Sequence, residues 1–399
     1  MKLADRMGRI GTETAFEAAA RARALQATGR DVIHLEIGEP DFDTPRNVSE
    51  AAADALLNQG MTHYTPATGI PQLKQAIVDD ARRHKGIEAT PEQVIVTPGA
   101  KPIMFYAMLA LLEDGDEAIY PNPGFPIYES MIEFVGAKAV AAELRAENEF
   151  RMDVDEVASL VTDRTRLIVL NSPQNPTGSV LTDADLAAIA RLAVDHDLVV
   201  LTDEIYGRLQ YEGEPRSIAT LPGMAERTIT LDGFSKTYAM TGWRMGYGIV
   251  PAWLAPAFST LVINSVSCTN AFAQAGAAEA LTGPQDAADA MREEFIARRS
   301  LVIDGLNAIP GVSCVMPHGA FYAFPNVSSF GRSSVEIADH LLYDAGVCVL
   351  AGTSFGRFGE GYLRLSYANS RENLAAALQR IGESLGRLER TGELVGAAS

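Results

Sequence analysis

A lysine and an arginine lie within an apolar, aromatic stretch of the chain at residues 233–246. Lys236 and Arg244 are embedded there among Phe, Tyr, Met and Trp side chains. Most Lys and Arg residues lie on solvated surfaces, but these neighbours favour a functional interpretation. Desolvation lowers the pKa of a lysine and makes its amine nucleophilic, while a guanidinium can bind a phosphate through two parallel hydrogen bonds. The stretch therefore predicts a nucleophilic amine beside an anion-binding group.

Three earlier segments are also rich in polar groups, and each has a second interpretation. In residues 97–102, Gly99 lets the backbone approach a ligand, and the helix start offers free N–H groups to a phosphate, although an ordinary strand–helix turn looks the same. Loop 171–178 is rich in Asn, Pro and Gly, which usually mark turns, but it follows an apolar strand, so an Asn side chain can point at the sheet edge. Asp203 is either a helix N-cap or the partner of a buried cation, and taken alone the cap is favoured.

All four segments follow predicted strands, and this shared placement is more informative than any one of them. From residue 94 onward, apolar runs alternate with helical patterns. Such alternation predicts a mainly parallel sheet with helices on both faces, and ligands bind at the carboxyl edge of an open parallel sheet. The expected strands are 94–97, 117–120, 166–170, 198–202, 228–231 and 246–250, with helices at 102–112, 126–135 and 183–195.

The flanking regions predict a second, smaller α+β domain. A long helix at 284–308 is expected to leave the large domain, and short strands follow near 320–324, 346–350 and 361–367. Before the sheet, helices are expected at 12–29, 46–59 and 69–85, with a strand at 32–37. We predict an N-terminal arm with part of the small domain at 1–45, a large domain at 46–285 and a small domain at 286–399.

Composition excludes several classes of protein. With 51 acidic and 33 basic residues, the net charge of -18 argues against a nucleic-acid or anionic-membrane partner. The three cysteines are an odd number without paired spacing, which suits a reducing compartment, and no apolar signal core or membrane-length run is present. We therefore expect a cytoplasmic protein.

Two kinds of site are also disfavoured by the motifs. The histidines show no metal-ligand spacing, so no metal is expected. No Gly-x-Gly-x-x-Gly motif follows an early strand, which argues against a nicotinamide dehydrogenase.

Residues 233–246 resemble the cofactor-lysine signature of the class I/II aminotransferases, the fold-type-I pyridoxal-phosphate family. Seven other segments resemble the family in the same order, so the similarity spans nearly the whole chain. They are 38–41, the Tyr64 region with Gly69, 99–101, 175–178, 203–206, 319–322 and 363–367. The resemblance implies a large domain with a mainly parallel seven-stranded sheet between helices, a smaller α+β domain, pyridoxal 5'-phosphate as cofactor, and a homodimer with shared active sites.

The resemblance also implies a role for each site residue. Lys236 would hold the cofactor as a Schiff base and shuttle the proton, and Asp203 would keep the pyridine nitrogen protonated, which makes the ring an electron sink. Tyr206 and Asn175 would hydrogen-bond the phenolic oxygen of the ring. The remaining cofactor contacts would come from Arg244, Gly99, Ala100, Lys101 and Ser235 around the phosphate, from Phe125 on the ring, and from Tyr64 of a second subunit. From the sequence alone, Phe125 is equally well a core aromatic.

Arg364 would bind the α-carboxylate of the substrate in a bidentate pair, assisted by Gly38 and Asn175. The chain departs from the family at Gly233, where many relatives carry a Ser that contacts the phosphate. Whether Ser235 substitutes for it stays open at this stage.

The implied reaction transfers an amino group from an L-amino acid to a 2-oxo acid such as 2-oxoglutarate or pyruvate, with ping-pong kinetics. Aspartate-specific relatives usually carry a Lys on the helix after the Gly99 loop, and residues 106–110 hold none, so a neutral, apolar or aromatic donor is favoured. An aspartate aminotransferase remains an alternative, because Lys101, Arg208 or the other subunit could meet a distal carboxylate. A carbon–sulfur β-lyase on the same fold is a further alternative. A DNA-binding regulator is disfavoured, because the family-like region leaves no room for another domain before it.

Overall fold

The central feature of the computed structural model, which describes residues 2–11, 13–391 and 394–396, is a sheet of seven strands. Their order across the sheet is β2-β8-β7-β6-β5-β3-β4. Only β8 runs antiparallel to its neighbours, so the expected mainly parallel seven-stranded sheet is confirmed. The bounds are β2 (Val94–Pro98), β3 (Glu117–Asn122), β4 (Lys138–Glu143), β5 (Thr165–Asn171), β6 (Val199–Asp203), β7 (Thr228–Gly233) and β8 (Met245–Ile249).

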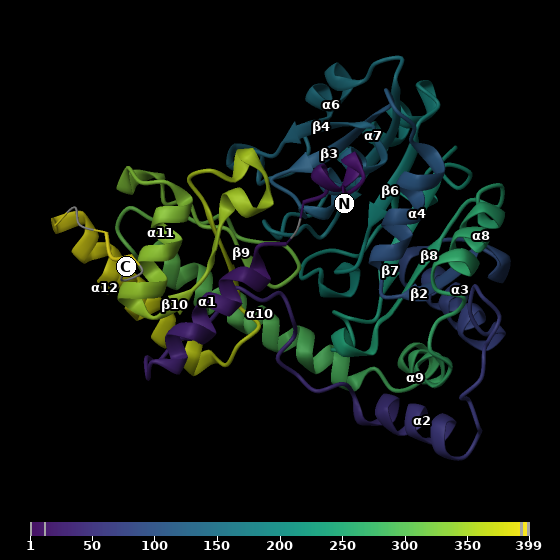
Figure 1. The fold of residues 1–399 in the computed structure, drawn as a ribbon, viewed down its shortest axis with the longest axis horizontal. Helices are drawn as coiled ribbons and strands as arrows, with labels where there is room; N and C mark the ends of the chain where they lie inside the picture. Colours follow the sequence, from purple (N-terminus) through teal and green to yellow (C-terminus); the bar gives the residue numbers. More distant parts are fainter. Residues whose placement is uncertain (1, 12, 392–393, 397–399) are drawn as a thin grey trace.

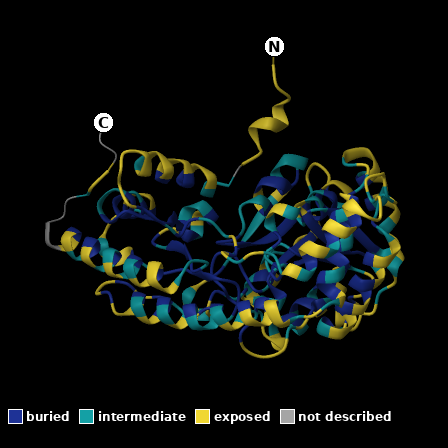
Figure 2. Ribbon diagram, turned by 90° about the horizontal axis from the view of Figure 1, so that it is seen from below, coloured by how far each residue is buried: buried dark blue, intermediate teal, exposed yellow. Residues whose placement is uncertain are grey.

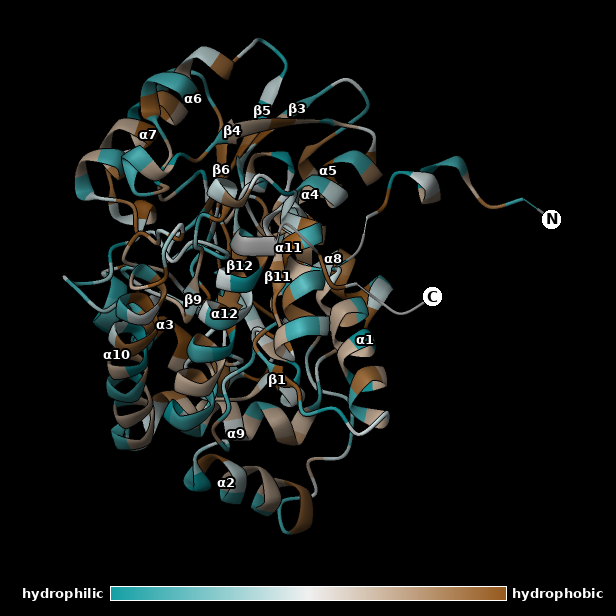
Figure 3. Ribbon diagram, turned by 90° about the vertical axis from the view of Figure 1, so that its left-hand side faces the viewer, coloured by the Kyte–Doolittle hydropathy of each residue, from teal (hydrophilic) through white to brown (hydrophobic). Residues whose placement is uncertain are grey.

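Both faces of this sheet are apolar because helices cover both. On β5, Ile168 and Leu170 pack toward α7, whereas Leu167 and Val169 pack toward α4, α5 and α8. In Figure 3, brown segments of the strands lie behind and between helices of mixed colour. The helices of this part are α2 (Arg46–Leu57), α3 (Pro71–Lys85), α4 (Lys101–Leu111), α5 (Ile127–Val135), α6 (Val154–Leu160), α7 (Asp183–Asp195), α8 (Ala255–Ser265) and α9 (Ala271–Thr282).

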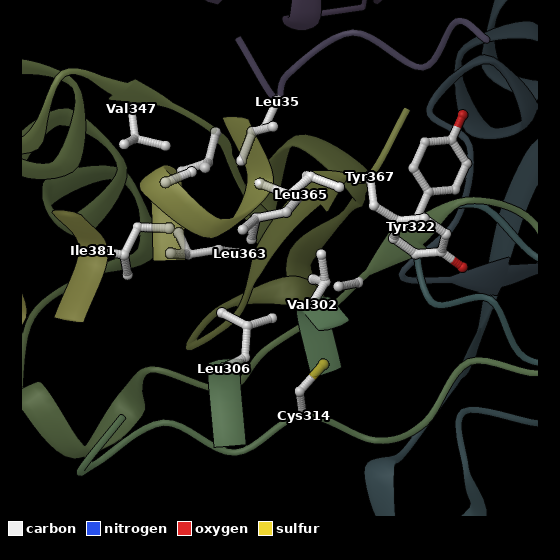
Figure 4. Close-up of a cluster of buried hydrophobic side chains, with 14 of the residues drawn as sticks. Leu35, Val302, Leu306, Cys314, Tyr322, Val347, Leu363, Leu365, Tyr367 and Ile381 are labelled. Atoms are coloured by element: carbon white, nitrogen blue, oxygen red, sulfur yellow. The ribbon is translucent and has the colours of Figure 1, made fainter. Parts of the chain in front are cut away.

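Helix α10 (Asp286–Asn307) connects the large sheet to a second group of elements, which Figure 1 shows gathered on the opposite side of the molecule. Figure 4 shows its core, where Val302 and Leu306 of α10 meet Leu363 and Leu365. The group contains β9 (Tyr322–Ala323), β10 (Val347–Cys348), β11 (Leu350–Ala351), β12 (Leu363–Ser366), α11 (Ser334–His340) and α12 (Arg371–Thr391), together with β1 (Ile33–His34) and α1 (Ala15–Ala27) from the start of the chain.

Two differences from the expected elements have physical reasons. The strand expected at 32–37 is reduced to Ile33–His34, because its partner β10 is itself only two residues long. Strand β4 was not expected, because its Lys-Ala-Val-Ala-Ala-Glu sequence is rich in alanine and lacks a strong strand pattern. Figure 2 shows the first residues, including the short helix Asp5–Gly8, extending exposed from the body.

Candidate active site

A cavity of about 470 Å³ lies where the carboxyl ends of the parallel strands meet the second group of elements. Asn171 and Asp203 are the last residues of β5 and β6 and line it, and Arg364 reaches it from β12. Most residues predicted for the site share this cavity. These are Gly38, Ala100, Lys101, Phe125, Asn175, Asp203, Tyr206, Ser235, Lys236, Arg244 and Arg364.

Lys236 presents its amine inside the cavity, just past the end of β7. Nζ donates a hydrogen bond to the carbonyl oxygen of Gly38 at 2.5 Å, and it lies 6.0 Å and 5.8 Å from the ring centres of Tyr206 and Phe321. Burial among these groups lowers the pKa of Lys236 to about 8. About a tenth of the amine is therefore uncharged at pH 7, far more than for an ordinary lysine, and is available as a nucleophile or a base.

Asp203 is a buried carboxylate held from two directions. The hydroxyl of Tyr128 donates to Oδ2 at 2.7 Å, and the backbone N–H of Ile205 donates to Oδ1 at 3.2 Å. Burial raises the pKa of Asp203 to about 6, and the two donors act against that rise. Above this pH, Asp203 is a poorly solvated anion, which is well suited to hold a cationic ligand group.

Arg364 stands on the opposite wall as a buried cation that is only partly paired. Its guanidinium carbon lies 4.7 Å from the ring centre of Tyr322, and Nη1 donates to Oδ1 of Asn175 at 3.5 Å. Nη2 donates to the carbonyl oxygen of Glu36, but Nε has no hydrogen-bond partner in the described part of the chain. A buried unpaired donor is costly, so the geometry favours an anion at this position.

Tyr206 and Tyr322 connect these groups. Their hydroxyl oxygens lie 2.6 Å apart, and burial raises the pKa of both phenols, so they stay neutral donors. A side chain at Gly38 would collide with the Tyr322 hydroxyl, so glycine is required where the backbone passes the cavity. Figure 4 shows Tyr322 at the edge of the small apolar core, with its hydroxyl pointing away from the aliphatic side chains.

A second anion-binding feature lies around Arg244 and the start of α4. The Arg244 guanidinium covers Gly99 so closely that any Cβ there would meet Nη2, and Gly99 has φ +82. Nη1 of Arg244 donates to the carbonyl oxygen of Thr241 at 2.7 Å. The free N–H groups at the start of a helix and a guanidinium together form a site for a phosphate-like group.

Three comparisons with known proteins identify the family. The profile described as "Aminotransferase class I and II" matches residues 30–381. The chain belongs to this family. It is 43% identical over 365 residues to an aspartate aminotransferase of Pyrococcus abyssi, covering 90% of this chain and 93% of that protein. It is 40% identical to aromatic-amino-acid aminotransferase 2 of Thermococcus litoralis, covering 96% and 98%. The aspartate aminotransferase of Thermus thermophilus with maleate superposes with a TM-score of 0.92 at 40% identity, covering 96% and 100%.

The enzyme is therefore an aminotransferase, and the fold-type-I architecture expected from the sequence is confirmed. No group of three or more His, Cys, Asp or Glu side chains is arranged to hold a metal ion among the residues described. No helix in the same residues is long and apolar enough to cross a membrane. Cys268, Cys314 and Cys348 are free thiols.

Of the residues predicted for the site of this aminotransferase, two lie outside the cavity and a third is paired with another side chain. Tyr64 is 89% exposed and borders a separate hollow near residues 268–272. Gly99 lies beneath Arg244 rather than on the cavity wall. The Lys101 ammonium forms an ion pair with Glu13 at the rim and lies 5.3 Å from the ring centre of Phe125.

Gly233, where the chain departs from many relatives, is tightly enclosed in this aminotransferase. A Cβ at this position would lie 3.0 Å from Cα of Gly246 and 3.2 Å from Cδ1 of Ile205. A hydroxyl side chain would be crowded here, while Ser235 lines the cavity.

Sequence reasoning missed Tyr128 and Glu13. Tyr128 lies on the predicted helix 126–135 and carries no local sign that its hydroxyl reaches β6. Glu13 reaches Lys101 across 88 positions of sequence, which no local pattern reports.

Proposed function

We propose that this aminotransferase uses pyridoxal 5'-phosphate, bound covalently by Lys236, to move an amino group from a neutral or aromatic L-amino acid to a 2-oxo acid such as 2-oxoglutarate or pyruvate. The observation that supports this best is the composition of one cavity. It holds the amine of Lys236, the carboxylate of Asp203 and the guanidinium groups of Arg244 and Arg364. Membership of a family whose members use this cofactor adds independent support.

The residues present fit the cofactor and its substrate. The Arg244 guanidinium lies directly against the backbone of Gly99 at the start of α4, and a cation beside the N–H groups of a helix start suits a phosphate. The unpartnered Nε of Arg364 suits the α-carboxylate of an amino acid. When bound, pyridoxal 5'-phosphate supplies a carbonyl for amine capture and a protonated ring that draws electrons from the α-carbon.

Each residue of the chain would contribute one task. Lys236 would hold the cofactor and later move the proton at the substrate α-carbon, which its pKa of about 8 permits. Asp203 would hold a proton on the ring nitrogen, and Tyr206 with Asn175 would donate to the phenolic oxygen. Phe125 would cover the ring. The remaining phosphate contacts would come from Ala100, Lys101, Ser235 and, in a second copy of the chain, Tyr64.

The rim of the cavity supports a neutral or aromatic donor. Phe16, Ile37 and Met104 line it with apolar groups. Lys101, which also lines the cavity, is already paired with Glu13, so its charge is offset there. The aromatic-amino-acid aminotransferase of Thermococcus litoralis is consistent with this choice.

Aspartate is the second candidate donor. Lys101 lines the cavity and could meet a distal carboxylate if Glu13 were displaced. Relatives named aspartate aminotransferase support this candidate.

We also propose that two copies of the chain associate and that the enzyme works in the cytoplasm. Tyr64 and Leu57 are 89% and 77% exposed in the single chain, and two shallow hollows border the same region. A second copy would cover this surface. The free thiols suit a reducing compartment.

The test is to reduce the protein with borohydride in the presence of pyridoxal 5'-phosphate and to map the modified peptide. We expect the adduct on Lys236, none in Lys236→Ala, and an unchanged adduct in Lys101→Ala, which removes the other lysine of the cavity. An adduct only at another lysine, or none, would refute the proposal. Comparing amino transfer to 2-oxoglutarate with pyruvate and ammonia release from cystathionine separates the transferase from a β-lyase.

A further inference from the structure

A buried ion triad lies behind the active site. Lys85, the last residue of α3, donates from Nζ to Oε2 of Glu204 at 2.8 Å and to Oδ2 of Asp232 at 2.6 Å. All three side chains are nearly excluded from solvent, with exposures of 6%, 7% and 12%. Glu204 follows Asp203 directly in sequence, and Asp232 lies on β7, the strand that leads to Lys236.

Each of the two carboxylates of the triad also accepts a hydrogen bond from a further donor. Ser217 donates to Oε1 of Glu204 at 2.6 Å, and the backbone N–H of Gly233 donates to Oδ1 of Asp232 at 2.6 Å. Lys85 and Glu204 border a separate cavity of about 450 Å³ that does not include Asp203. None of the three triad residues lines the active-site cavity itself.

The charges of the triad do not cancel. One ammonium faces two carboxylates, so the formal charges of the triad sum to one negative charge in a buried region next to Asp203 in the sequence. A buried ion pair contributes little net stability compared with well-packed apolar groups, so stability alone gives a weak reason for it. Both Asp232 and Glu204 act in the direction that raises the pKa of Asp203, in addition to burial. Without Lys85, this repulsion would increase.

We propose that Lys85 is a positioning residue for Asp203, because its buried charge offsets the two carboxylates behind Asp203 and keeps Asp203 ionised for a cationic ring nitrogen. This inference rests on the proposed role of Asp203. Lys85 acts only through Glu204 and Asp232.

Other titratable groups around these residues remain in every variant used below. Tyr128 from α5 and Tyr206 face Asp203, and burial raises the pKa of both phenols, so they stay neutral. On the side of the triad, Tyr247 of β8 donates to Oδ2 of Asp232 at 3.3 Å. Asp80 of α3 acts on both Lys85 and Asp232, and Arg208 lies beside it.

The test compares Lys85→Met with the double variant Lys85→Met/Glu204→Gln. The single variant leaves both carboxylates uncompensated, whereas the double variant restores the original net charge without restoring any ion pair. The measured quantity is the dissociation constant, against pH, of pyridoxal 5'-phosphate and of its 1-deaza analogue, in which carbon replaces the ring nitrogen. The ratio of the two constants reports the charge on Asp203 without any need for turnover.

We expect Lys85→Met to raise the pKa of Asp203 by about one unit from about 6, which costs about twofold of the preference for the natural cofactor at pH 7 and about tenfold near pH 5. The pH below which the preference for the natural cofactor is lost should move upward in Lys85→Met. The double variant should recover most of that preference. A single variant that behaves like the wild type, or a double variant as impaired as the single one, would overturn the proposal.

Asp203→Asn separates failure of this inference from failure of the proposed function. If Asp203→Asn keeps the full preference, the role of Asp203 itself is wrong. If Lys85→Met does not fold, Glu204→Gln alone tests the same inference in the opposite direction. Lys85 then faces only one carboxylate, so less negative charge lies near Asp203 and its pKa should fall. The preference should persist to lower pH in that variant, and an unchanged or upward shift would overturn the proposal.

Discussion

The hydroxyl of Tyr128 and the carboxylate of Asp203 form a buried 2.7 Å hydrogen bond that joins α5 to the end of β6. Tyr128 is fully buried, and burial raises the pKa of its phenol well above the ordinary range. It is therefore a permanent donor, and it acts against the effect of burial on Asp203.

Replacing Tyr128 with Phe should raise the pKa of Asp203 above about 6, because that donor is lost. Asp203 becomes protonated as the pH falls through its pKa, so a higher pKa moves the acidic limb of kcat/KM to higher pH. A hydrogen bond to a charged group contributes about 1.5–3 kcal/mol, which corresponds to about one to two pH units. The measurement is the pH profile of kcat/KM. Tyr106→Phe is the control, because Tyr106 pairs with Ser265 and does not contact Asp203. An unshifted limb in Tyr128→Phe would contradict the assignment.

Replacing Arg364 with Lys should raise KM for the amino acid about tenfold to a hundredfold. Lysine cannot reproduce the planar pair of donors, and a lost charged hydrogen bond is worth about 1.5–3 kcal/mol. Steady-state kinetics measure the change, and the affinity for pyridoxal 5'-phosphate should stay nearly constant. Arg357→Lys serves as the control, because Arg357 is an exposed arginine of the same part of the chain. If both variants bind amino acids equally well, Arg364 does not bind the carboxylate.

Replacing Glu13 with Gln should free Lys101 and increase kcat/KM for aspartate. The side chains of Lys101 and Glu13 are 45% and 21% exposed, so their ion pair is weak and the gain in kcat/KM should be modest. About twofold to fivefold is expected from the small strength of such pairs. Activity on phenylalanine or tyrosine should change less, which a panel of donors measures directly. Lys101→Gln should abolish any gain when combined with Glu13→Gln, and a fall in aspartate activity in Glu13→Gln would contradict this role of Lys101.

Mixing an inactive variant with one that binds the cofactor weakly tests whether Tyr64 acts on the neighbouring subunit. Tyr64→Ala should weaken binding of pyridoxal 5'-phosphate, although Tyr64 lies outside the cavity of its own chain. After co-refolding Tyr64→Ala with Lys236→Ala, a mixed dimer should contain one complete site, so activity and cofactor affinity should partly return. Size-exclusion chromatography with light scattering verifies the dimer. No recovery in a proven mixed dimer would show that Tyr64 does not cross the interface.

Much of the site follows from the sequence alone. Lys236, Asp203 and Asn175 each come just after an apolar strand, and parallel strands bring their carboxyl ends to one edge whatever the details of packing. The alternation of strands and helices was therefore enough to predict that these groups share a cavity. The family resemblance around Arg364 predicted a substrate-binding residue, and Arg364 lines the same cavity.

Other relationships were decided only by the tertiary structure. Tyr128 meets Asp203 across 75 positions of sequence, and Lys85 meets Glu204 and Asp232 across 119 and 147. A strand pattern depends on residues that are neighbours in the chain, so it can be recognised from the sequence. A buried hydrogen bond or ion pair depends instead on how helices pack against the sheet. The residues proposed to perform the chemistry could thus be predicted from the sequence, whereas the buried partners that they meet are found only in the folded chain.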